Sequence, residues 1–123
     1  MNHIKNTEAA IEFWSTVPAE SVNLSEFRAD LCTDDPPSCD SPACFGGWLP
    51  YSAYFAALSV IANEAGYPDF SGALMSTAEV SLALFGHSYM FSSRGNDECG
   101  TDHEVITARL RAHLAYLISA NDK

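Results

Sequence analysis

The segment Cys39-Asp-Ser-Pro-Ala-Cys-Phe-Gly-Gly-Trp48 constrains the fold more than any other part of the chain. It separates a loop over residues 32–41, rich in proline and aspartate, from the most apolar run of the sequence. Ser41 is a favoured helix N-cap residue, and Pro42 suits the first helical position because its missing N–H would be unpaired there anyway. We therefore expect a helix to begin at Pro42, with Cys44 as its third residue.

Two adjacent glycines and a tryptophan close the same segment. Gly46 and Gly47 each lower helix stability by about 1 kcal/mol relative to alanine, so they are best explained by another backbone packing closely there. Trp48 then fills the adjacent space. Pro50 predicts a kink, or a break with a new helix starting at that residue. Beyond it, helical periodicity predicts a central helix that ends at Gly66 and carries Tyr51, Tyr54, Phe55, Leu58, Ile61 and Ala62.

Apolar periodicity predicts four more helices, over residues 7–17, 23–31, 76–85 and 101–120. No segment alternates polar and apolar residues as a half-buried strand would. The sequence therefore predicts an all-α fold: a compact single domain, residues 1–123, built as a bundle of about five helices with two long irregular loops.

Local signals mark where these helices begin. Asn6 or Thr7 can cap the first helix. Ser76-Thr-Ala-Glu79 and Thr101-Asp-His-Glu104 are capping boxes, in which a hydroxyl and a carboxylate reciprocally bind backbone N–H groups. Acidic residues beside His103 suit a helix N-terminus, so we expect this imidazole to be solvated rather than catalytic.

The net charge of the sequence limits which classes of molecule the protein is expected to bind. Sixteen acidic and six basic residues give a net charge of −10. Direct binding to nucleic acid or anionic membranes needs clustered cations, and Arg109 with Arg111 form the only close cationic pair. An acidic surface instead favours a protein partner with a basic surface. The loop carboxylates Asp34, Asp35 and Asp40 are the candidate partner-binding residues.

The cysteines leave three readings open. Cys39 and Cys44 could supply one pair of zinc ligands, but no tight second pair accompanies them, so we expect no metal or cofactor. Cys44 in a first helical turn could be a reactive thiolate favoured by the helix dipole. No base is placed near it by the sequence, and Phe45 with Trp48 favours the third reading, a small buried side chain. None of the common catalytic motifs is present, so the sequence favours a protein that is not an enzyme.

The Cys39-x4-Cys44-x-x-Gly47-Trp48 block resembles a motif in small uncharacterised phage and bacterial proteins. In that family a Cys-Gly-Thr-x-x-Cys-Ile-Ala-Gly-Trp block opens an apolar helix, followed by a helix ending in Leu-Phe and a Thr-capped last helix. Leu84-Phe85 and Thr101 resemble those later features, whereas Asp40-Ser41-Pro42 and Pro50 depart from the pattern. The resemblance spans roughly residues 39–118. It implies a phage, prophage or mobile-element accessory protein and carries no activity.

These features converge on one expected function. The polar N-terminal residues and the lack of a long apolar run predict a cytoplasmic protein that neither enters a membrane nor binds nucleic acid directly. We expect a small acidic protein-interaction module that binds a host or defence protein. A thiol-dependent enzyme or redox protein using Cys44 and a small structural zinc domain are the alternatives, and the oligomeric state is not predicted.

Overall fold

The computed structural model describes residues 2–22, 44–62, 68–70, 75–88, 90–92 and 98–121. These ranges are mostly helical and also contain a small antiparallel sheet, so the predicted helical class is confirmed in part and the sheet was not expected. The α-helices are α1 (His3–Trp14), α2 (Phe45–Trp48), α3 (Ala53–Ala57), α4 (Thr77–Phe85) and α5 (Asp102–Asn121). The strands are β1 (Val60–Ala62) and β2 (Pro68–Phe70), and 3-10 helices span Ala19–Ser21 and Leu49–Tyr51.

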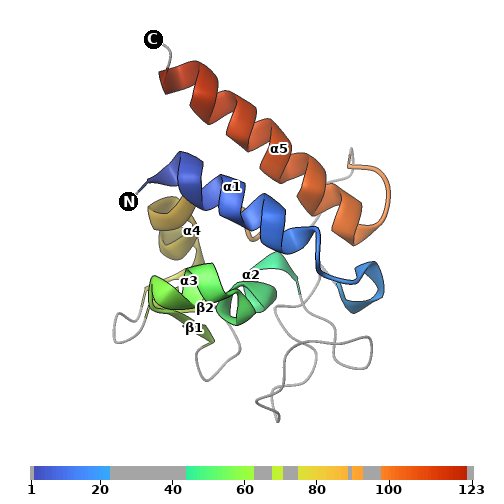
Figure 1. The fold of residues 1–123 in the computed structure, drawn as a ribbon, viewed down its shortest axis with the longest axis horizontal. Coiled ribbons are helices and arrows are strands. Elements are labelled where there is room, and N and C mark those ends of the chain that lie inside the picture. The colour runs from blue at the N-terminus through green and yellow to red at the C-terminus, as the bar shows by residue number, and fades with distance from the viewer. Residues whose placement is uncertain are drawn as a thin grey trace.

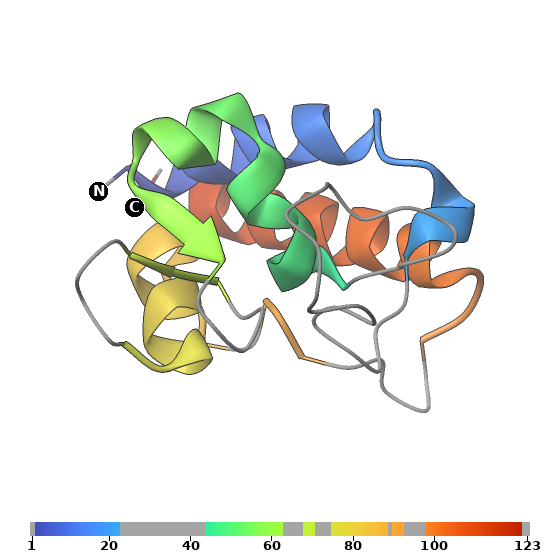
Figure 2. The same cartoon turned by 90° about the horizontal axis from the view of Figure 1, so that it is seen from below.

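Helix α1 lies in the middle of the molecule. The longest helix, α5, runs antiparallel to it on one side, and α2, α3 and the sheet lie on the other side (Figure 1). Seen from below, the α2–α3 segment lies in front of part of α1 and α5, with the sheet and α4 next to it (Figure 2). The core therefore forms between α1 and its neighbours, and its largest fully buried side chains include Trp14, Phe45, Phe55 and Phe85.

Helix α1 begins four residues earlier than its periodicity predicted. The Asn2 side chain caps it by accepting a hydrogen bond from the Lys5 N–H at 3.0 Å. The prediction that Asn6 or Thr7 caps the helix was wrong, because both are buried inside it. The Thr7 hydroxyl instead donates to the His3 carbonyl at 2.7 Å.

Asn6 joins three helices through its buried amide. Its Nδ2 donates to the Leu84 carbonyl in α4 at 2.8 Å, and its Oδ1 accepts from the Tyr54 hydroxyl in α3 at 2.6 Å. Only 2% of this residue is exposed. A buried amide must be paired to avoid a desolvation cost, so these bonds determine how α1 sits against α3 and α4.

The predicted central helix to Gly66 is wrong. Pro50 lies in a 3-10 turn, Ser52 caps a new short helix, and α3 ends at Ala57. Ser59 then takes a positive φ of 70°, a left-handed conformation that cannot continue the helix. The following Val60–Ala62 strand pairs antiparallel with Pro68–Phe70, and its β-branched residues at 60 and 61 are compatible with a pleated strand.

Both predicted capping boxes are confirmed. In α4 the Ser76 hydroxyl accepts from the Glu79 N–H and the Glu79 carboxylate accepts from the Ser76 N–H. Thr101 and Glu104 exchange the same pair of bonds at 3.1 Å each. The Thr101 N–H, helped by the Thr101 hydroxyl, lowers the pKa of the Glu104 carboxyl.

The segment after α4 is held against the core by buried side chains. Met90 and Phe91 are buried. The buried Ser81 hydroxyl donates to the His87 carbonyl at 2.5 Å and accepts from the Met90 N–H at 3.1 Å. The predicted helix over residues 23–31 lies outside the described residues.

We predict that Asn6→Ala lowers the free energy of unfolding by about 2–3 kcal/mol, because it leaves a buried carbonyl and a hydroxyl without partners. Tyr54→Phe, which removes one of the two bonds, serves as the milder control and should cost about 1 kcal/mol. Urea unfolding followed by circular dichroism measures both. A smaller loss for Asn6→Ala than for Tyr54→Phe would show that Asn6 does not hold the helices together.

Candidate functional site

The structure describes the Cys39–Trp48 segment from Cys44 onward. Helix α2 begins at Phe45 with Cys44 as its N-cap residue, so the expected start at Pro42, with Cys44 as the third helical residue, was wrong. The extended backbone of Cys44 (ψ −179°) sets this start, because a residue with that ψ cannot continue a helix. The remaining predicted residues of this region lie outside the described residues: Asp34, Asp35, Cys39, Asp40, Ser41 and Pro42.

The Cys44 thiol is buried, and its surroundings disfavour the charged thiolate form. Only 2% of the residue is exposed. Burial raises the pKa of the Cys44 thiol to about 11, and the nearby N–H groups of Gly47 and Gly46 offset this only in part. A reactive thiol needs a depressed pKa and access to solvent. This geometry counts against the thiol-enzyme alternative and matches the reading of Cys44 as a small buried side chain.

Phe45, between Cys44 and the glycines, occupies the centre of the aromatic core. Its ring centroid lies 5.4 Å from Trp14, 5.8 Å from Phe85 and 5.7 Å from Phe91. Gly46 and Gly47 are also buried. We expected burial at Phe45 and Trp48 but gave the central packing role to Trp48, whereas Phe45 occupies that position.

Trp48 is buried as predicted and also has a polar partner. Its Nε1–H donates to the Ser21 carbonyl at 3.0 Å, and its ring lies 6.4 Å from Phe13. Only 8% of the residue is exposed. Trp48 therefore joins α2 to the end of α1 and to the 3-10 turn that follows it.

A reciprocal pair joins the C-terminal end of α1 to the first turn of α5. The Trp14 Nε1–H donates to the His103 carbonyl at 3.1 Å, and His103 Nε2 donates to the Trp14 carbonyl at 2.8 Å. Nε2 carries the proton because a carbonyl can only accept. The two rings stack 5.1 Å apart. The expectation of a solvated His103 was therefore wrong, because the imidazole packs on the indole.

His113 is a buried polar residue that the sequence analysis did not single out. Its Nε2 donates to the Phe85 carbonyl at the end of α4 at 2.6 Å. The rings of His87 and Tyr116 lie 5.6 Å and 6.1 Å away. The bond satisfies a carbonyl that the end of α4 leaves free, so His113 has a structural role here.

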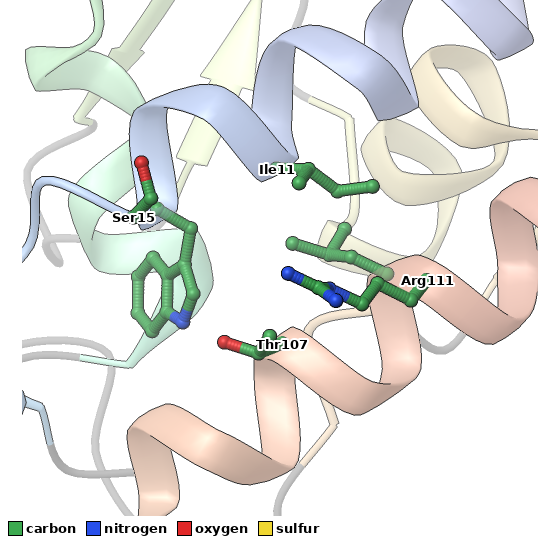
Figure 3. Close-up of a pocket in the computed structure, with 6 residues that line it drawn as sticks. Ile11, Ser15, Thr107 and Arg111 are labelled. Atoms are coloured by element: carbon green, nitrogen blue, oxygen red, sulfur yellow. The ribbon is translucent and has the colours of Figure 1, made fainter.

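A small hollow lies in the seam between α1 and α5 (Figure 3). Ile11 in α1 and the C-cap residue Ser15 border it on one side, and Thr107 and Arg111 border it from α5 (Figure 3). Its volume of about 40 Å³ accommodates a few water molecules at most, because one water needs roughly 10–15 Å³ on this measure. A metabolite does not fit in it.

Within the described ranges, no three His, Cys, Asp or Glu side chains lie close enough together to hold a metal ion. Arg109 is bound to Glu98 through two hydrogen bonds, at 2.7 and 2.6 Å, and also donates to the Ser92 carbonyl.

No helix in the described part of the chain is both long and apolar enough to cross a membrane.

We predict that Trp48→Ala destabilises the fold by about 3–5 kcal/mol, as expected for a large buried aromatic side chain. Trp48→Phe is the matched control: it keeps a ring against Phe13 but loses the bond to the Ser21 carbonyl, at a cost of about 1–2 kcal/mol. Chemical denaturation gives both values. A loss under about 1 kcal/mol for Trp48→Ala would show that this indole does not anchor α2.

We also predict that Cys44 resists alkylation in the folded protein, whereas the exposed Cys99 reacts. The raised pKa of Cys44 means that raising the pH increases its thiolate fraction substantially only as the pH approaches about 11. Peptide mass spectrometry after iodoacetamide treatment, with and without denaturant, resolves the two cysteines. Equal labelling of Cys44 and Cys99 at neutral pH in the native state would contradict this prediction and reopen the thiol alternative.

Comparison with known proteins identifies no relative of this chain. No protein-family model matches the chain, and no curated protein or solved structure is significantly similar to it. The likeness of the Cys39–Trp48 segment to phage and bacterial proteins therefore rests on that short motif alone.

Proposed function

We propose that this chain is a small acidic protein-interaction module that binds a partner with a basic surface. The observation that carries the proposal is an uncompensated negative charge. The sequence has ten more acidic than basic residues. A surface with this imbalance attracts a basic partner and accelerates its association.

The described surface is consistent with this imbalance. In the part of the chain that the structure describes, Glu8, Glu12 and Glu20 are exposed, whereas Lys5 and Arg111 are the exposed cations. Arg109 is already engaged by Glu98. The carboxylates of Glu8, Glu12 and Glu20 are therefore available to solvent or to a binding partner.

Two features favour binding over catalysis. The seam between α1 and α5 has room for only a few water molecules. The Cys44 thiol is buried with a raised pKa. Neither feature suits a substrate, whereas a compact helical body with an acidic exterior suits recognition of another macromolecule.

The proposed contact region is the acidic loop that contains Asp34, Asp35 and Asp40. This loop has three carboxylates within seven residues, and its two prolines disfavour regular structure. The motif resemblance suggests a phage or mobile-element setting, in which the partner is a cytoplasmic host or defence protein. Direct binding to nucleic acid is not part of this proposal.

The test is a pull-down from host lysate with the tagged protein at low and high salt. We expect specific partners to be retained at low salt and lost at high salt, because screening weakens contacts between exposed charges. The variant Asp34→Asn/Asp35→Asn/Asp40→Asn should lose the same partners.

A second triple variant, Glu20→Gln/Glu64→Gln/Asp122→Asn, controls for net charge. It removes the same number of carboxylates from elsewhere in the sequence and should keep the partners. Equal losses in both variants would reduce the interaction to general electrostatic attraction and overturn the role of the loop. Recovery of no partner at either salt concentration would count against the interaction proposal as a whole.

A further inference from the structure

A stripe of side chains on α1 borders the seam with α5. Ile4, Glu8, Ile11 and Ser15 are spaced at i, i+4, i+7 and i+11, which places them on one side of the helix. Ile11 and Ser15 line the hollow in the seam, so this side faces it (Figure 3). Glu8 is exposed, and the isoleucines are partly buried.

A stripe with the same spacing borders the seam from α5. It consists of Thr107, Arg111, Leu114 and Ile118. Thr107 and Arg111 line the hollow, which identifies this side of α5 as the one beside α1 (Figure 3). Arg111 is exposed, and Ile118 is 44% exposed although it is a large apolar side chain.

Each stripe carries one charge, and the two charges have opposite sign. Among the described side chains, neither the Glu8 carboxylate nor the Arg111 guanidinium has an ion-pair or hydrogen-bond partner. The nearest residues along α5 cannot pair with Arg111, because positions three and four residues away are Thr107, Ala108, Leu114 and Ala115. The seam therefore presents an apolar strip with an unpaired acid on one helix and an unpaired base on the other.

We propose that this α1–α5 face binds a second copy of the chain in a two-fold symmetric dimer. With the two-fold axis running along the seam, α1 of one copy lies over α5 of the other. Arg111 of each copy then faces the Glu8 carboxylate of the second copy, and the partly exposed isoleucines of both copies meet between them. The two ion pairs are equivalent by symmetry.

The alternation of charge favours a second copy over another protein. A uniformly basic partner would be repelled by Arg111, and a uniformly acidic one by Glu8. A matching partner must present an acid and a base in reversed order, and the two-fold axis generates that arrangement from the face itself. Because each copy has a net charge of −10, repulsion elsewhere opposes the contact, so the dimer is weak.

Sedimentation velocity over a concentration series tests the ion pairs. At about 150 mM salt the Debye length is about 8 Å, so general repulsion is screened while close pairs persist. We expect Glu8→Arg and Arg111→Glu each to raise the dimer dissociation constant about tenfold or more. The double exchange Glu8→Arg/Arg111→Glu, which has the wild-type net charge, should restore it to within about threefold.

Glu8→Arg is the sharpest single variant because it makes the protein less negative. If general repulsion controlled association, this change would strengthen the dimer. Weakening by Glu8→Arg followed by recovery in the double exchange shows that association depends on opposite charges at these two positions.

Two aspartate substitutions on α5 test the apolar part of the face. Ile118 and Tyr116 are both exposed, and being two residues apart they point to opposite sides of the helix. We expect Ile118→Asp to abolish dimer formation and Tyr116→Asp to leave it unchanged, although both add the same charge. Thermal melts by circular dichroism verify that each variant is folded.

A wild-type protein that stays monomeric up to about 1 mM would overturn the dimer. So would failure of the double exchange to recover association, or equal effects of Ile118→Asp and Tyr116→Asp. This inference does not rest on the proposed function. Asp34→Asn/Asp35→Asn/Asp40→Asn tests the acidic loop and should leave the dimer intact, so the two proposals can fail separately.

Discussion

The buried amide of Asn6 is the interaction on which the arrangement of the helices depends. It joins α1 to the Leu84 carbonyl of α4 and to the Tyr54 hydroxyl of α3, in a site that is almost closed to solvent. Apolar packing alone tolerates sliding and rotation of helices, whereas an amide with a donor and an acceptor on different sides accepts one arrangement. At the other end of α1, the reciprocal bonds between Trp14 and His103 join it to α5. The position of α1 is therefore determined at both ends.

This fixed position has consequences for the surface. Asn6 and Trp14 of α1 form hydrogen bonds to other helices. The outer side of α1 therefore carries Glu8 and Ile11, beside α5. The aromatic cluster around Phe45 fills the interior without leaving a cavity for a substrate in the α1–α5 seam. Both the acidic loop proposal and the dimer proposal place function on the exterior of a body whose interior is used for stability.

The candidate site was only partly predictable. The burial of Cys44 and Trp48 followed from an apolar context and from the size of the indole, and the structure agrees. The start of α2 did not follow, because the preferences of Ser41 and Pro42 for helix starts are local and weak beside the extended backbone at Cys44. The α1–α5 seam could not be predicted at all, since Ile11 and Arg111 meet only when two helices far apart in the sequence pack together.

Features that depend on a few neighbouring residues could be predicted from the sequence. The capping boxes at Ser76 and Thr101 are examples, because hydroxyl and carboxylate lie three residues apart and need no other part of the chain. Tertiary structure decided the rest. Residues 60–62 formed a strand instead of continuing a helix because Pro68–Phe70 offered them backbone partners. His113 became buried because the end of α4 presented the Phe85 carbonyl to it. In each case the deciding hydrogen bond came from a distant residue, which local periodicity does not encode.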